Sequence, residues 1–265
     1  MSRARRERAL PLAGLIVLLV LSLAGRSRTV LAASDEIQVY LDDVNEPGEL
    51  GLDVHVNYVL SGSATPEWPG ELPPSHVLQV TPEFSLGATR SLELGLYLPT
   101  AAGPGGGLYG NGVKVRVKFV PRRGPGARFF WGANLELGCA ARRVSEERWT
   151  VELRPILGYR SGRMLIAFNP ILGLPIRHDT LGNGELEPAL KLGYYVRSGL
   201  ALGLEYYAAV GSPDGLLPAA QQEHALYAVA DYERHRFSLN LGVGRGLTSA
   251  TDRWVVKAIV GLRSR

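Results

Sequence analysis

Residues 50–60 read LGLDVHVNYVL, and their apolar and polar side chains alternate one by one. Asp53, His55 and Asn57 occupy odd positions, while the even positions carry leucine, valine and tyrosine. Successive side chains of a β-strand point to opposite faces, so this stretch predicts a strand with one apolar and one polar face.

The same alternation recurs eleven more times along the chain. The further segments are residues 76–88, 92–98, 113–120, 129–139, 149–159, 164–174, 186–196, 200–210, 226–232, 237–243 and 254–262. None of the twelve apolar faces carries Asp, Glu, Lys or Arg. The chain is therefore expected to be all-β, with twelve strands.

Alternation alone does not decide which face points inward. A soluble sandwich or a lipocalin-like barrel would bury the apolar face, whereas a transmembrane barrel would turn it toward lipid. Segments of about ten residues match tilted transmembrane strands. Short and long connections alternate, except at residues 121–128, and aromatic residues lie near the ends of the apolar faces. We therefore predict a 12-stranded antiparallel transmembrane β-barrel over residues 50–265, in the outer membrane of a Gram-negative bacterium.

The first 33 residues resemble a secretory signal peptide. An arginine-rich start precedes an apolar run of about 15 residues, and cleavage is expected after Ala32 or Ala33. The alternative is a membrane anchor, but the run is shorter than the roughly 20 residues that a spanning helix needs. Residues 34–49 then form an N-terminal segment that is either periplasmic or tucked into the lumen.

Charge and cysteine content exclude several classes of function. The net charge of +4 over 265 residues comes from the leader, which holds six arginines and one acid. The remaining chain is close to neutral, which removes the charge argument for binding nucleic acid. The single cysteine, Cys139, excludes an intrachain disulfide and any multi-cysteine zinc site. We expect no metal, no cofactor and no catalytic residues; outer-membrane lipid and a small-molecule solute are the expected partners.

Four prolines lie inside the predicted strands at apolar positions: Pro82, Pro155, Pro170 and Pro188. Proline cannot donate a hydrogen bond to a neighbouring strand, and a closed barrel has no free edge to accommodate it. We expect bulges or local pinches at these positions.

Residues 84–99, FSLGATRSLELGLYLP, resemble a hairpin of the MetA-like putative transporters, a family of exported barrels linked to the meta-pathway of phenol degradation. Residues 36–59, EIQVYLDDVNEPGELGLDVHVNYV, are similar to uncharacterised proteobacterial outer-membrane barrels. The resemblance implies a barrel that passes a small molecule, often an aromatic or apolar one. It implies no catalytic residues. The chain departs from many such barrels at its C-terminus, which ends in Arg265 rather than in an aromatic residue.

The alternation along each strand assigns a mixed set of charged side chains to the lumen. The predicted pore-lining residues are Asp53, His55, Glu83, Glu93, Lys114, Arg116, Lys118, Glu136, Arg148, Glu152, Arg154, Glu187, Lys191, Glu205, Asp231 and Lys257, with Asn57, Asn134, Asn169 and Asn240. Because both signs are present, the lumen could form a small polar pore or a closed network of salt bridges.

These residues lead to three hypotheses for function. The first is a passive channel or uptake protein for a small solute, with Lys114, Arg116 and Lys118 biasing selection. The second is a structural or interaction barrel with a blocked lumen and partner-binding loops. The third is a hydrolase at the rim, for which Ser75-His76 and His178-Asp179 are the candidate pairs, although neither pair has an identifiable third orienting group.

Overall fold

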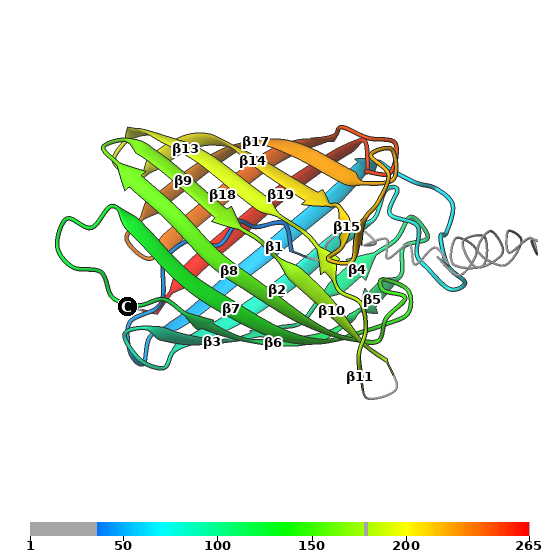
Figure 1. The fold of residues 1–265 in the computed structure, drawn as a ribbon, viewed down its shortest axis with the longest axis horizontal. Coiled ribbons are helices and arrows are strands. Elements are labelled where there is room, and N and C mark those ends of the chain that lie inside the picture. Colours follow the sequence, from blue (N-terminus) through cyan, green and yellow to red (C-terminus); the bar gives the residue numbers. More distant parts are fainter. Residues whose placement is uncertain (1–35, 178–179, 265) are drawn as a thin grey trace, which may run out of the picture. The chain divides into compact units, whose positions relative to one another are not determined.

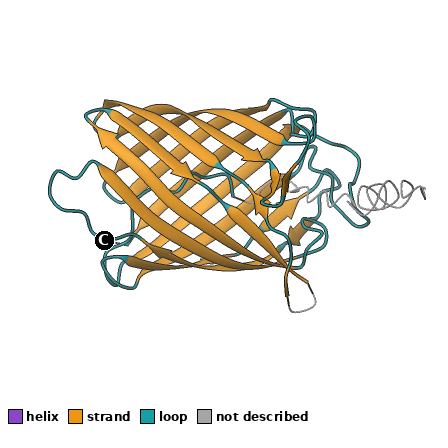
Figure 2. Cartoon of the chain, in the orientation of Figure 1, coloured by secondary structure: helices purple, strands orange, loops and turns teal. Residues whose placement is uncertain are grey.

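The computed structural model describes residues 36–177 and 180–264, so the predicted signal peptide lies outside the described residues. All regular structure in this part of the chain is β-strand (Figure 2). No helix of the described part is long and apolar enough to cross a membrane.

Nineteen strands form the wall and its loops (Figure 1). They are β1 (Leu50–Ser61), β2 (Leu78–Gly87), β3 (Leu92–Tyr97), β4 (Thr100–Ala102), β5 (Leu108–Gly110), β6 (Gly112–Phe119), β7 (Phe129–Ala140), β8 (Trp149–Ser161), β9 (Met164–Asn169), β10 (Leu172–Arg177), β11 (Thr180–Leu181), β12 (Glu185–Leu186), β13 (Ala189–Arg197), β14 (Leu200–Ala209), β15 (Gly211–Ser212), β16 (Gly215–Leu216), β17 (Glu223–Arg234), β18 (Phe237–Gly246) and β19 (Trp254–Arg263). Each crossing of the wall, made of one strand or of two strands in line, is here called a stave. Four staves are interrupted and consist of two strands each: β3–β4, β5–β6, β9–β10 and β12–β13. Together with eight continuous strands they give the predicted twelve staves, which confirms the fold class.

The sheet closes on itself where the first and last strands pair. β1 and β19 run antiparallel from Gly51↔Arg263 to Ser61↔Trp254. Because β1 also pairs with β2, and each later stave with its neighbours, the wall has no free edge. Closure lets every stave satisfy its backbone groups within the wall, as a bilayer requires.

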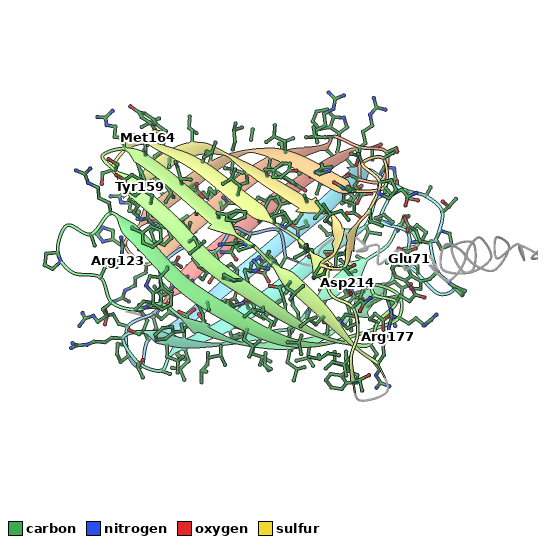
Figure 3. All side chains as sticks on the ribbon, viewed as in Figure 1. Glu71, Arg123, Tyr159, Met164, Arg177 and Asp214 are labelled. Carbon is green, nitrogen blue, oxygen red and sulfur yellow. The ribbon has the colours of Figure 1, made fainter. Side chains whose placement is uncertain are left out.

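The apolar faces point outward. On β6, Val113, Val115 and Val117 are 40%, 48% and 42% exposed, whereas Arg116 and Lys118, on the opposite face of the same strand, are buried. Figure 3 shows the side chains that project from the outer surface of the wall. The outward apolar face is the arrangement that lipid favours, so the transmembrane alternative holds and the soluble one does not.

The four prolines behave in two ways. Pro82 and Pro155 lie inside β2 and β8, and the pairing with β1 and with β7 passes through them without a shift, so no bulge forms on these sides. On the other side of each strand, the pairing with β3–β4 and with β9–β10 is interrupted opposite the proline. Pro170 and Pro188 lie where their staves are interrupted, between β9 and β10 and between β12 and β13. Continuing the registers places Pro155, Pro170 and Pro188 side by side on three neighbouring staves. Three missing N–H donors at one level account for the interruptions there.

The two ends of the barrel differ in their connections. Residues 88–91, 120–128, 162–163, 198–199 and 235–236 connect staves at one end, here called the turn side. Longer connections join them at the other end, the loop side. Loops there contact each other: the Trp68 Nε1–H donates to the Arg142 carbonyl oxygen at 2.6 Å.

A charge on the outer face tests its exposure to lipid. Leu135 lies midway along β7 and is 50% exposed, and Phe129 begins that strand at the turn side. Leu135→Arg should lower the free energy of unfolding in lipid vesicles by about 2–4 kcal/mol, and Phe129→Arg by no more than about 1 kcal/mol. Equal, small losses in urea titrations of both variants would show that this face is not in lipid.

Candidate functional site: the barrel lumen

The lumen contains the N-terminal segment, defined here as residues 36–49. This segment forms no strand, yet Tyr40 is buried and bound to the wall. The Tyr40 N–H donates to Asn169 Oδ1 at 2.7 Å, and Asn169 Nδ2 donates back to the Tyr40 carbonyl at 3.1 Å. The Tyr40 hydroxyl lies 2.5 Å from that of Tyr97 and donates to Glu136 Oε1 at 3.1 Å. The backbone and side chain of Tyr40 thus connect the segment to three separate staves.

Ion pairs hold both ends of the segment. Glu36 lies 3.5 Å from the Lys114 Nζ and 3.7 Å from an Arg154 nitrogen. Toward the turn side, Asp42 pairs with Arg160 at 2.7 Å and also with Arg123. Because opposite charges face each other at each end, the segment complements the charge of the wall.

An apolar cluster fills the turn-side half of the lumen. Val39 and Tyr40 pack there with wall side chains that point inward, among them Phe130, Ile156 and Leu165. Phe130 is 1% exposed and Ile156 is fully buried. A barrel of twelve strands is too wide for wall side chains alone to fill, and the segment supplies the missing volume.

The charged wall residues form compact networks inside the barrel. Arg116 bridges Glu83 and Glu93, and His55 Nε2 lies 3.1 Å from Glu83. A second network joins Lys191 and Lys257 to Glu205, at 2.9 and 2.5 Å, and Lys191 also to Asp231 at 2.8 Å. Lys257 Nζ in addition donates to the Ile37 carbonyl at 2.8 Å, which ties this network to the N-terminal segment.

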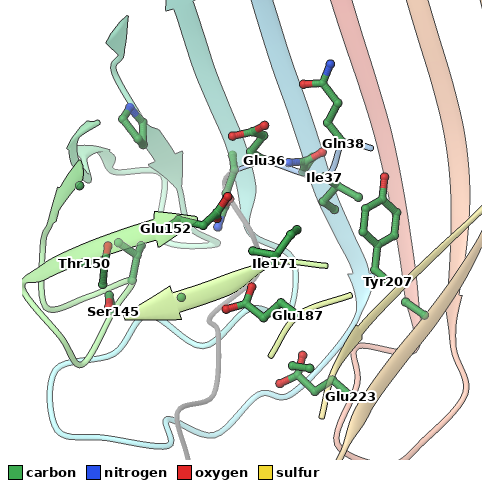
Figure 4. A pocket seen from close by; sticks show the side chains of 18 of the residues that line it. Glu36, Ile37, Gln38, Ser145, Thr150, Glu152, Ile171, Glu187, Tyr207 and Glu223 are labelled. Carbon is green, nitrogen blue, oxygen red and sulfur yellow. The ribbon is translucent and has the colours of Figure 1, made fainter. Parts of the chain in front are cut away.

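The loop-side half of the lumen encloses a cavity of about 310 Å³ (Figure 4). Among the described residues, six carboxylates line it but only two cationic side chains do, Lys114 and Arg154. The carboxylates belong to Glu36, Glu136, Glu152, Glu187, Glu223 and Asp252. Both cations already pair with carboxylates of Glu36, Glu136 and Glu152, whereas Glu187 makes no ion pair with any described residue. The cavity therefore has more carboxyl groups than cationic side chains.

Asp252 belongs to the loop between β18 and β19, outside the membrane-spanning strands. Burial is the largest influence and raises the pKa of its carboxyl group to about 6, against a hydrogen bond from the Ser63 backbone that lowers it. The nearby carboxylates of Glu67 and Glu71 raise this pKa further. Asp252 is thus ionised at neutral pH and becomes neutral below about pH 6, where the cavity loses one negative charge.

The structure places the predicted pore-lining residues as follows. Buried among the inner wall are His55, Glu83, Glu93, Arg116, Lys118, Glu136, Arg154, Lys191, Glu205 and Lys257, and half-buried are Asp53, Lys114, Glu152, Glu187 and Asp231. Arg148 differs, because it lies exposed in the loop before β8. Lys114, Arg116 and Lys118 each face carboxylates, Lys118 meeting Asp43 at 3.7 Å, so this strand presents no uncompensated positive charge to a solute.

Of the two candidate rim pairs, the structure describes only Ser75-His76. His76 faces the Tyr58 hydroxyl at 3.3 Å, and no hydrogen bond between Ser75 and His76 side chains occurs in the described part of the chain. His178 and Asp179 lie outside the described residues. Sequence reasoning missed Tyr40 and Tyr97 as lumen contacts. Tyr97 could have been found, since it continues the inward parity of Glu93.

A closed antiparallel barrel of twelve staves, apolar outside and charged within, defines an outer-membrane β-barrel protein. Comparison with solved structures agrees. The chain is similar to an outer membrane channel from Pseudomonas putida F1, with a TM-score of 0.60 and 14% identity, over 86% of this chain and 100% of that one. It is also similar to the NanC porin, with a TM-score of 0.53 and 10% identity, over 79% and 97% of the two chains.

At these identities the likeness shows the fold alone. No family model matches the sequence, and no curated protein matches it. The resemblance to MetA-like transporters therefore has no support from a family model, and what stands is the coarser likeness to outer-membrane channels and porins.

Removing one member of a buried network tests how tightly the lumen is paired. Glu205→Ala leaves Lys257, whose side chain is 0% exposed, without its carboxylate, and should cost about 3–5 kcal/mol of unfolding free energy. Glu147→Ala is the control, because its partner Arg177 is 46% exposed and the loss should stay below about 1 kcal/mol. A similar, small loss in both variants, measured by urea unfolding, would contradict the networks described here.

Proposed function

We propose that this protein is an outer-membrane channel for a small solute, which its N-terminal segment holds closed. One observation carries the proposal: the segment fills the turn-side half of the lumen, while the loop-side half keeps a cavity of about 310 Å³ that is lined by six carboxyl groups. A solute can enter the cavity from the loop side, but it can pass onward only when the segment moves.

The contacts of the segment suit a movable closure. Residues 36–45 pair with no strand, and side chains supply most of their contacts with the wall. Backbone bonds to the wall occur further along, where Gly48 donates to Gly87 at 2.8 Å. Because water can replace polar contacts of this kind, the segment can leave the lumen at lower cost than a stave can leave the wall.

The excess of carboxylates in the cavity favours a cationic solute. Clefts lined by charge of one sign concentrate ions of the opposite sign, and charged side chains set selectivity in pores. Glu187 is well placed for this role, because it points into the cavity and forms no ion pair with a described residue (Figure 4). This preference replaces the expectation that Lys114, Arg116 and Lys118 bias selection.

A second candidate is a barrel that binds a partner through its loops and never conducts. The filled turn-side half of the lumen favours it. The two functions differ in what happens when the segment is released, because a channel then conducts and an interaction barrel gains nothing.

Releasing the segment should open the channel. The double variant Asp42→Asn, Asp43→Asn removes the carboxylates of the segment that pair with Arg123, Arg160 and Lys118. It should raise the open probability of the channel several-fold in planar bilayers, and deletion of residues 36–45 should do the same.

The matched control is Glu46→Gln, which removes a charge from an exposed side chain of the same segment and should leave conductance unchanged. Heat-shifted gel mobility confirms folding of each variant. If the double variant and the deletion both fold and conduct no more than the parent protein, the channel hypothesis is contradicted and the interaction barrel is supported.

Charge reversal in the cavity should change ion preference. Glu187→Lys in the background of the deletion should lower the cation-to-anion permeability ratio several-fold, read from reversal potentials in a salt gradient. Glu146→Lys makes the same change on an exposed loop outside the cavity and should have a much smaller effect. Equal shifts in the two variants would argue against selection within the cavity.

A further inference from the structure

Exposed arginines gather at the turn side of the barrel. Seven of them form what is here called the arginine rim: Arg90, Arg122, Arg128, Arg163, Arg197, Arg234 and Arg236. Each of the five turns contains or borders at least one of them. Within the described chain none of the seven makes an ion pair with a carboxylate, unlike Arg123 and Arg160, which pair inward with Asp42.

The topology spreads these charges around the barrel rather than into one patch. Successive turns are two staves apart, so they are separated by on the order of 10 Å along the rim. The sixth junction, where β1 begins and β19 ends, carries Arg263, which pairs with Asp53 at 3.0 Å. Among the described residues, the exposed carboxylates on this side are fewer, namely Asp43, Glu46 and Glu233.

The rim lies directly beyond an aromatic girdle. Phe129, Tyr159, Tyr194 and Phe237 occupy the outer face near the turns, between 37% and 55% exposed. Aromatic girdles mark the boundary between hydrocarbon and headgroups, so arginines one step further out stand at the depth of the headgroups.

The loop side differs in how its charges are paired and mixed. Its exposed arginines are Arg142, Arg148, Arg177, Arg245 and Arg253; they lie among the exposed carboxylates of Glu67, Glu146 and Asp214, and Arg177 pairs with Glu147. A ring of unpaired arginines just beyond the aromatic girdle matches an anionic leaflet on the turn side. Arginine suits phosphate, because its planar guanidinium donates two parallel hydrogen bonds to phosphate oxygens.

We infer that the arginine rim binds the phosphate groups of anionic phospholipids in the leaflet on the turn side. This inference requires only that the barrel spans a membrane, and it is independent of the proposed channel. The bound lipids would form an annulus that fixes the depth of the barrel in the bilayer.

The tryptophans make this binding measurable on each side separately. Trp131 lies on the outer face of β7 near the turns and is 50% exposed, whereas Trp149 and Trp254 begin their strands at the loop side. A full-length variant with Trp68→Phe, Trp149→Phe and Trp254→Phe reports from Trp131 alone. A second variant keeps Trp149 as the loop-side reporter and carries Trp68→Phe, Trp131→Phe and Trp254→Phe.

The experiment compares quenching of each reporter by brominated phosphatidylglycerol and by brominated phosphatidylcholine in phosphatidylcholine vesicles. At Trp131, the quenching should show a preference for phosphatidylglycerol over phosphatidylcholine on the order of fivefold. This preference should be smaller at high salt. Near Trp149 the preference should be close to one. A preference of one at Trp131, as expected if the rim serves an acidic protein instead, would overturn the inference.

A triple variant tests the rim arginines that lie in the two turns nearest β7 and β8: Arg122→Gln, Arg128→Gln and Arg163→Gln. It should abolish the preference for phosphatidylglycerol at Trp131. The matched control removes three exposed arginines from the loop side: Arg142→Gln, Arg148→Gln and Arg253→Gln. It should leave the preference at Trp131 unchanged. If the triple variant does not fold, Arg163→Gln alone should reduce the preference. A preference that survives in the folded rim variant, or that falls equally in the control, would contradict phosphate binding at the rim.

Discussion

The pairing of β1 with β19 is the interaction on which the rest of the structure depends. Hydrocarbon offers no partner to an open edge, so the wall must close, and closure fixes which face of each strand meets lipid. The apolar side chains then turn outward, and the charged side chains along the middle of the staves face the lumen. The electrostatics of the interior are thus a consequence of ring closure as well as of composition.

Confining so many charges creates the next requirement, which is pairing. Arg116 with Glu83 and Glu93, and Glu205 with Lys191 and Lys257, satisfy it within the wall. The wall alone leaves a central space, and the N-terminal segment fills the turn-side part of it with Val39 and Tyr40 and adds carboxylates where the wall has arginines. The loop-side part is left open and acidic, and this asymmetry along the axis is the basis of the proposed function.

The period of two in residues such as 50–60 and 113–120 was sufficient to predict the staves, their number and the direction of their faces, because a membrane barrel applies one rule to every strand. The pairing of inner charges was out of reach, since it depends on register between distant strands. Lys114, Arg116 and Lys118 look like a basic stripe in sequence, yet each meets acids from other staves or from the N-terminal segment. Pro82 and Pro155 sit in unbroken strands for a related reason: whether a missing N–H matters depends on the residue opposite.

Occupancy of the lumen by residues 36–49 is the central claim, and thiol accessibility tests it most directly. In a Cys139→Ala background, Val39→Cys replaces a side chain that is 3% exposed, and Glu46→Cys replaces an exposed one on the same segment. With the folded barrel in vesicles, a bulky charged thiol reagent should label position 46 quickly and position 39 slowly by orders of magnitude. Equally fast labelling at both positions would show that the segment lies outside the lumen and would contradict the account.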